Sequence, residues 1–227
     1  MNADTRIPLS VAGPDEFANY FNISRETIDL LKIYEETLRQ WQKTINLIAP
    51  STVESIWQRH FADSAQLLRL APENVRSWVD LGSGAGFPGM VVAILLAGQR
   101  SPGEGSIVRL IESDARKAAF LGEIARKTAV AVDIIHGRIE LSSTQSSFGA
   151  VEIVSARALA PLERLLGLSS PFFGPDTIGL FPKGREVERE IDTARKHWDF
   201  DVRLEQSLTD REGRIAVIRQ LAAKSKG

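Results

Sequence analysis

The sequence predicts an α/β protein with a mostly parallel, Rossmann-like sheet and helices on both faces. From position 77 onward, short runs of apolar and β-branched residues alternate with segments of helical periodicity, a pattern typical of βαβ units. A glycine-rich loop follows the first of these runs. The last two runs, Asp201–Leu208 and Arg214–Leu221, are joined by a polar turn that ends in glycine, which predicts a C-terminal antiparallel hairpin.

An N-terminal helical extension is expected over residues 1–74, ahead of an α/β domain at 75–227, the two forming one compact unit. Ser24 can cap a helix that runs to about Ile48, because apolar residues recur there every three or four positions. A shorter helical stretch begins at Pro50 and contains Arg59-His60-Phe61-Ala62-Asp63-Ser64.

The elements of the α/β domain follow in order along the chain. Periodicity and β-branched content predict parallel strands at Trp78–Leu81, Ile107–Ile111, Val130–Ile135, Val151–Val154 and Thr177–Phe181. Helical patterns separate them at Met90–Ala97, Asp114–Lys127, Ala158–Leu166 and Glu186–His197. Pro88 stands at the first turn of the first of these helices, where proline is favoured.

Composition narrows the class of protein. The 227 residues carry a net charge of −1 and contain no cysteine, which excludes disulfides and thiolate metal sites and fits a reducing, cytoplasmic setting. Residues 1–13 lack the apolar core of a signal peptide, and the longest apolar run, Met90–Ala97, is too short to span a bilayer. For the same reason no membrane partner is expected. The three histidines lie in unrelated segments, so no metal site is expected either.

The glycine loop is the strongest indication of a ligand site. Asp80 ends the first strand, and Gly82, Gly84 and Gly86 follow on alternate positions. A backbone without Cβ atoms can lie against a ligand, and an acid beside it favours a cationic, hydroxyl-rich one such as S-adenosylmethionine. Residues 84–89 also satisfy G-x-G-x-x-G, the dinucleotide pattern. Two residues intervene between strand and loop, however, and Asp80 would repel a pyrophosphate.

Side chains at the ends of the next two strands complete the expected cofactor site. Glu112 can accept hydrogen bonds from ribose hydroxyls, because ligands in open α/β sheets bind at the carboxyl ends of strands. The loop after the third strand could place Ile139 against an adenine face and Glu140 at its edge. A plain turn explains that loop equally well.

Two cations follow the fourth and fifth strands, at the rim where a second substrate would enter. Arg157 can bind a phosphate or carboxylate with its guanidinium fork, and Lys183 can meet a phosphate beside Gly184. The alternatives are a surface arginine and a solvated lysine in a turn.

Taken in order, these motifs resemble one family. Five parallel strands closed by an antiparallel pair are similar to the class I S-adenosylmethionine-dependent methyltransferases. The more specific resemblance, from about Glu36 to Leu221, is to the bacterial small-subunit ribosomal RNA guanine-N7 methyltransferases, also called glucose-inhibited division protein B. It rests on Asn46-Leu47, Arg59–Ser64, Val79–Gly89, Gly137–Glu140, Ser155–Ala158 and Lys183-Gly184. It implies cofactor contacts at Gly82, Phe87, Ile139, Glu140 and Arg157.

The resemblance implies a function for the chain. Residues 75–227 would be the methyltransferase domain, acting as a monomer on small-subunit ribosomal RNA or an assembling ribosomal particle. The RNA side would include Arg59, His60, Arg157 and Lys183. No catalytic base is expected, because N7 of guanine has a lone pair and no proton to lose. Two other classes stay open: a NAD-dependent oxidoreductase of Rossmann type, and a non-catalytic module that binds S-adenosylmethionine or RNA.

Overall fold

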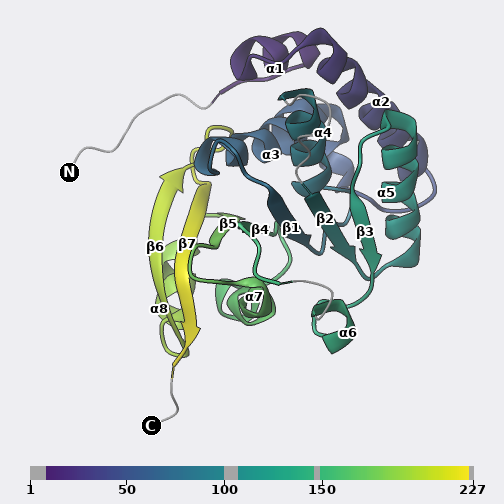
Figure 1. Cartoon of the computed structure of the whole chain (residues 1–227). Helices are drawn as coiled ribbons and strands as arrows, with labels where there is room; N and C mark the ends of the chain where they lie inside the picture. The colour runs from purple at the N-terminus through teal and green to yellow at the C-terminus, as the bar shows by residue number, and fades with distance from the viewer. Residues whose placement is uncertain (1–8, 100–106, 146–148, 225–227) are drawn as a thin grey trace.

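One seven-stranded sheet forms the centre of the molecule (Figure 1). The computed structural model describes residues 9–99, 107–145 and 149–224. The strands lie in the order β3-β2-β1-β4-β5-β7-β6, and β7 alone runs opposite to the other strands, pairing antiparallel with β5 and β6. Their bounds are β1 Ser77–Leu81, β2 Ile107–Glu112, β3 Asp133–His136, β4 Ile153–Ser155, β5 Ile178–Lys183, β6 Trp198–Gln206 and β7 Arg214–Ala223. The predicted sheet and its C-terminal hairpin are therefore confirmed.

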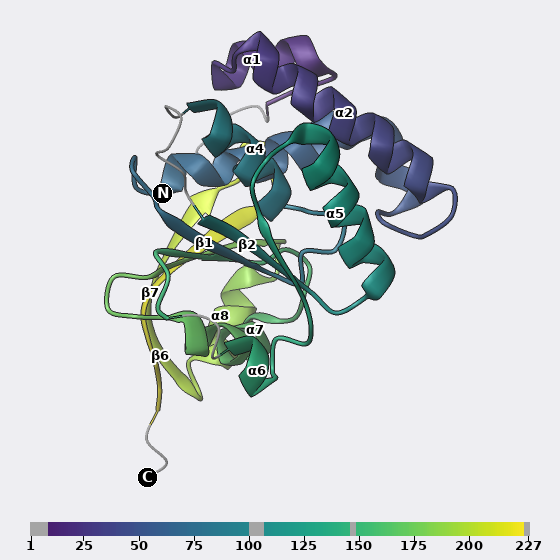
Figure 2. The ribbon, with the colours of Figure 1, turned by 45° about the vertical axis from the view of Figure 1, so that its right-hand side comes forward.

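Helices cover both faces of this sheet (Figures 1 and 2). Alternation along β1 sends Trp78 into one apolar cluster, with the N-terminal helices, α4 and α5, and Val79 into a second cluster with α7 and α8. The α-helices are α1 Pro14–Phe21, α2 Arg25–Gln42, α3 Asp63–Ala65, α4 Gly89–Gln99, α5 Ala115–Thr128, α6 Ser142–Gln145, α7 Leu162–Ser169 and α8 Val187–Ala194. None of the helices in the described part of the chain is long and apolar enough to cross a membrane.

The long N-terminal helix begins as expected and ends early. The Ser24 hydroxyl accepts a hydrogen bond from the Thr27 amide at 3.3 Å, which caps α2. The helix stops at Gln42 rather than near Ile48. The Gln42 side-chain oxygen instead accepts from the amides of Leu47 and Ile48, at 2.9 and 3.0 Å. This side chain binds the backbone as it turns away, and so replaces the helical hydrogen bonds.

The second helical stretch is irregular. It passes through a 3₁₀ segment, a π-helical turn, the short α3 and a further 3₁₀ segment, with bounds η1 Pro50–Ser55, η2 Trp57–Ala62, α3 Asp63–Ala65 and η3 Gln66–Leu70. Single π turns inside helices are frequent at functional sites. Arg59 and His60 lie on this π turn, and Asp63 follows it directly.

Helix α7 begins at Leu162, four residues later than the sequence predicts. Ala158 adopts a left-handed backbone, with φ of 53°, which a helix cannot contain. Pro161 then precedes the helix, and the Leu162 amide donates to Glu190 Oε2 at 2.6 Å. Residues 158–161 consequently form a loop at the carboxyl end of β4.

The extension and the sheet share one apolar cluster, and a polar junction joins them at one edge. The Leu9 amide donates to the Leu208 carbonyl at 2.7 Å. The Gln58 amide nitrogen donates to the carbonyls of Leu9 and Thr209, at 2.7 and 3.1 Å. The Leu208 amide donates to Gln66 Oε1 at 2.8 Å. Residues near both ends of the chain are thereby held against the irregular helix.

Candidate active site

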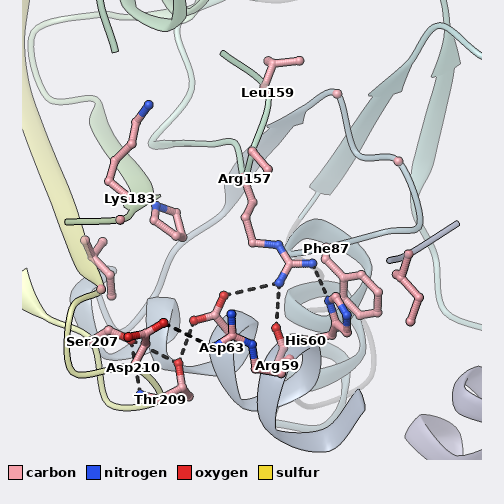
Figure 3. A pocket seen from close by; sticks show the side chains of 18 of the residues that line it. Arg59, His60, Asp63, Phe87, Arg157, Leu159, Lys183, Ser207, Thr209 and Asp210 are labelled. Carbon is pink, nitrogen blue, oxygen red and sulfur yellow. Dashed lines mark hydrogen bonds and ion pairs between the residues drawn. The ribbon is translucent and has the colours of Figure 1, made fainter. Parts of the chain in front are cut away.

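A cavity of about 860 Å³ opens at the carboxyl ends of β1, β4 and β5 (Figure 3). The glycine loop, the irregular helix, the loop after β4 and the turn between β6 and β7 line it. The chain runs outward from β1 to β3 and returns to β4 on the other side of β1. Ligands of open α/β sheets bind at such a switch point, and the volume lies in the range of small-molecule sites.

The glycine loop presents bare backbone to this cavity. Gly82 and Gly84 have left-handed backbones, with φ of 64° and 58°, a conformation that favours glycine. A Cβ on Gly82 would lie 2.7 Å from Leu159 Cδ1. On Gly84 the nearest atom would be the Gly82 carbonyl oxygen at 3.8 Å. The face of Gly84 is therefore open, with room for a ligand.

Tyr34 of α2 holds the loop from behind. Its hydroxyl donates to the Ala85 carbonyl, and its ring stacks on Phe87 with centroids 5.4 Å apart. Burial raises the pKa of Tyr34 well above its ordinary value, so the hydroxyl stays protonated and can donate. In the sequence, Tyr34 belongs to the apolar stripe of this helix, and such a stripe predicts packing alone. The only signal of a further role is a hydroxyl within an apolar stripe.

Asp80 does not face the cavity, although its position at the strand end predicts a charge beside the ligand. The side chain is fully buried. Its two oxygens accept from the Ser155 hydroxyl at 2.7 Å and the Gly89 amide at 3.2 Å. Strand alternation explains this, because Asp80 shares the face of Trp78, beneath the start of α4. Burial raises the pKa of Asp80 to about 6.

Glu112 is connected to the glycine loop. Its two oxygens accept from the amides of Gly84 and Asp114, both at 2.7 Å, and the residue is 7% exposed. Each carboxylate oxygen has a second lone pair, so Glu112 keeps acceptor capacity for hydroxyl groups. The structure thus brings this acid to the loop, as the sequence predicts.

The two residues expected at the adenine lie apart from this arrangement. Ile139 is buried in the second apolar cluster. Glu140 is exposed, with an oxygen 3.7 Å from a guanidinium nitrogen of Arg164. Neither is among the described residues that line the cavity. Their predicted contact with the cofactor stays a prediction.

Arg157 reaches from the end of β4 to the irregular helix (Figure 3). Its Nη1 donates to the Arg59 carbonyl at 2.9 Å and lies 3.3 Å from Asp63 Oδ2, and its Nη2 lies 2.7 Å from His60 Nδ1. The guanidinium carbon lies 5.1 Å from the centroid of the Phe87 ring, within the range of cation–π attraction. This side chain therefore joins the sheet, the glycine loop and the extension.

His60 is a neutral imidazole in the cavity wall. It stacks on Phe87 with centroids 4.7 Å apart, and its Nε2 lies 2.8 Å from the Thr52 hydroxyl. Burial, together with the charges of Arg157 and Arg59, lowers the pKa of His60 to about 3. The sequence gives His60 to the RNA side, but both ring nitrogens already have partners within the chain.

The other two expected cations have different surroundings. Lys183 is largely buried, and its ammonium donates to the Ala160 carbonyl and to Glu190 Oε2, both at 2.8 Å. Arg59 is about half exposed and lies 3.2 Å from Asp210. Both line the cavity. Lys183 is therefore not the solvated lysine that the alternative interpretation describes.

Asp63 is a central residue of the site that the sequence prediction omits. Its Oδ1 accepts from Gln66 Nε2 and from the Thr209 hydroxyl, both at 2.8 Å, while Oδ2 faces Arg157. A carboxylate one helical turn after Arg59 was the available signal. Across the described residues, no group of three or more His, Asp or Glu side chains could hold a metal ion.

Comparison with known proteins gives one family and one fold. A family model described as GidB, rRNA small subunit methyltransferase G, matches residues 27–218. The protein named ribosomal RNA small subunit methyltransferase G from Parvibaculum lavamentivorans is 46% identical over 211 residues, covering 93% of this chain and 91% of the relative. The protein of that name from Rhodospirillum centenum is 45% identical over 222 residues, covering 98% and 97%.

Solved structures show the same architecture at low identity. The SAH-bound methyltransferase PaMTH1 of Podospora anserina has a TM-score of 0.57 at 12% identity, covering 95% of this chain and 98% of the other. A TehB-like SAM-dependent methyltransferase of Corynebacterium glutamicum has a TM-score of 0.54 at 12% identity, covering 83% and 98%. At these identities the likeness is one of fold.

Proposed function

The chain belongs to the rRNA small subunit methyltransferase G family, GidB, and we propose that it methylates N7 of a guanine in small-subunit ribosomal RNA. The methyl donor of this S-adenosylmethionine-dependent activity would bind at the glycine loop. The family expected from the sequence is thus confirmed. The observation that carries the proposal is the open face of Gly84 beside Glu112, at the switch point of a methyltransferase fold.

The residues present fit the cofactor. Gly84 leaves the backbone bare where its amino-acid end would lie, and Gly82, whose missing Cβ makes room for Leu159, would contact the cofactor through its backbone. Glu112 keeps lone pairs for ribose hydroxyls, which hydrogen-bond an acid at this strand end in related folds. When bound, S-adenosylmethionine supplies an electrophilic methyl group on a positively charged sulfur. Contacts at Phe87, Ile139, Glu140 and Arg157 complete the proposed cofactor site.

The chain's own contribution is alignment rather than proton transfer. Guanine N7 has a lone pair and no proton to lose, so no side chain has to act as a base. Holding two reactants in line can supply roughly 7–11 kcal/mol of a barrier. Arg59, Arg157 and Lys183 line the cavity and are the proposed RNA contacts. Of the three, Arg59 has the largest exposed fraction, 49% of its side chain.

The decisive experiment follows labelled methyl from S-adenosylmethionine into purified ribosomal RNA and into small-subunit particles, with nucleoside analysis of the product. We expect N7-methylguanosine from at least one substrate, and less of it from the Gly84→Val control when S-adenosylmethionine is limiting. Cofactor binding without transfer to either substrate would favour the non-catalytic module. Calorimetric binding of NAD in place of S-adenosylmethionine would favour the oxidoreductase.

The setting of this reaction is part of the same proposal. We place it in the cytoplasm, with the protein acting as a monomer on ribosomal RNA or an assembling particle. The absence of cysteine in the sequence supports a reducing compartment. Sedimentation with and without RNA tests the monomer.

A further inference from the structure

We propose that His60 is a positioning residue, which holds the guanidinium of Arg157 over the glycine loop through hydrogen bonds whose direction is fixed by Thr52. The imidazole would act through Arg157 rather than by touching the RNA. The inference rests on the proposed function in assigning Arg157 to the cofactor site and in the methyl-transfer assay that tests it.

The direction of the hydrogen bonds follows from the number of protons available. The Thr52 hydroxyl donates its only hydrogen to the Ala49 carbonyl, at 2.8 Å. Toward His60 Nε2, also at 2.8 Å, the same oxygen can therefore only accept. Nε2 must carry the imidazole proton, and Nδ1 is left with a lone pair. That lone pair accepts from Arg157 Nη2 at 2.7 Å.

The imidazole ring is fixed in its plane as well as in its tautomer. It stacks on Phe87 at 27° between planes, and Phe87 stacks in turn on Tyr34 at 13°. The residue is 8% exposed, so a ring flip would require surrounding side chains to move. A ring flip would also direct a carbon at Arg157 in place of a nitrogen. Packing and hydrogen bonding therefore select the same orientation.

The irregular helix supplies two more acceptors to the same guanidinium. The Arg59 carbonyl and Asp63 Oδ2 accept hydrogen bonds from Arg157 Nη1, at 2.9 and 3.3 Å. Residues 59, 60 and 63 lie within about one turn, at the π-helical segment and directly after it. Arg157 lies just after β4 but is oriented by the extension, which gives this part of the extension a role in the site.

The charged groups facing His60 support a neutral ring. Arg157 and Arg59 face it, and both disfavour a second ring proton. Asp63 is paired with Arg157. A neutral ring whose two nitrogens are satisfied has little affinity for phosphate, which distinguishes the positioning role from the direct RNA contact that the sequence suggests.

The test uses two nearly isosteric substitutions. In His60→Asn, the side-chain oxygen stands close to the position of Nδ1 and keeps an acceptor for Arg157. In His60→Leu, the acceptor is lost at similar size. We expect His60→Leu to lower kcat/KM for methyl transfer to RNA by about 10- to 100-fold, the effect of a hydrogen bond to a charged group, and His60→Asn to recover most of it. Equal losses in both variants would overturn the proposal.

A double-mutant cycle shows whether His60 acts through Arg157. Combining His60→Leu with Arg157→Ala should give a loss no larger than that of Arg157→Ala alone. Additive losses would show an independent role and overturn the inference. Where His60→Leu fails to fold, Thr52→Val and its conservative partner Thr52→Ser replace the pair, and only Thr52→Val should reduce activity.

A readout without cofactor or RNA separates this inference from the proposed function. Long-range ¹H–¹⁵N correlation spectra of the wild-type protein should show His60 protonated at Nε2 alone, with no titration from about pH 5 to 8. A protonated Nδ1, or titration in that range, would refute the positioning role. If the spectra agree but no RNA is methylated, the proposed function fails while the arrangement of His60 and Arg157 stands.

Discussion

Replacing Asp80 with asparagine should remove a pH dependence from the stability of this protein. The carboxyl lies beneath α4, fully buried, between the Ser155 hydroxyl and the Gly89 amide. Burial disfavours its ionised form and raises its pKa from 3.8 to about 6. Asparagine keeps the size and an acceptor oxygen but cannot ionise.

The magnitude follows from the two pKa values. Because the folded value is the higher, the folded state holds the proton more tightly, and stability falls as pH rises from 3.8 through about 6. The full difference is worth roughly 3 kcal/mol, at about 1.4 kcal/mol for each pH unit. About 2 kcal/mol of it is lost between about pH 4.5 and 7.5. This figure counts the contribution of Asp80 only.

Urea unfolding of wild type and Asp80→Asn at several pH values measures it. The unfolding free energy of wild type minus that of the variant should fall by about 2 kcal/mol as the pH rises from about 4.5 to 7.5. His60, with a pKa lowered to about 3, acts in the opposite direction, and the difference cancels its contribution. A difference independent of pH would refute the reasoning. Ser155→Ala provides a second check, because losing its hydroxyl should raise the pKa of Asp80 further.

Three further outcomes concern the ligands. Gly84→Val should weaken S-adenosylmethionine binding by roughly tenfold or more. The left-handed backbone of the valine should cost about 1–2 kcal/mol of stability. Unchanged affinity in calorimetry would remove the loop from the site. Glu112→Ala should lose about 1.5–3 kcal/mol of cofactor affinity, and an analogue without ribose hydroxyls should bind wild type and variant alike. Arg59→Ala should lower the slope of log RNA affinity against log salt by about 0.7–0.9 while cofactor affinity stays constant, and an unchanged slope would place the RNA elsewhere.

Much of the fold could be predicted because local pattern and tertiary position agree. The runs at Trp78–Leu81 and Ile107–Ile111 are too apolar for any place except a covered sheet, and both became parallel strands. The end of α2 could not be predicted, because it depends on a side chain, Gln42, that replaces helical hydrogen bonds over six positions. The late start of α7 depends similarly on Glu190, which is distant in sequence.

Some features of the candidate site could likewise be predicted from the sequence, and others could not. Glycines and a strand-end acid predict a ligand loop from sequence alone, and Glu112 meets Gly84 as this reasoning requires. The surroundings of Lys183 depend on the following helix, α8. Its ammonium, which has no evident partner in the sequence, forms an ion pair with Glu190 of that helix. Strand alternation, applied strictly, would have placed Asp80 beneath α4 from the outset.

The polar junction between the chain's two ends has a consequence for synthesis. Leu9 and Gln58 bind Leu208 and Thr209, which leave the ribosome roughly 150 to 200 residues after their partners. The irregular helix must wait for the final hairpin before its side chains are satisfied, even though earlier strands can already associate. A nascent chain that ends at Lys196 should therefore be cut by protease within residues 50–70, where the full chain resists. Asp63, one of the three acceptors around Arg157, therefore gains its Thr209 partner only after the hairpin of β6 and β7 has been made.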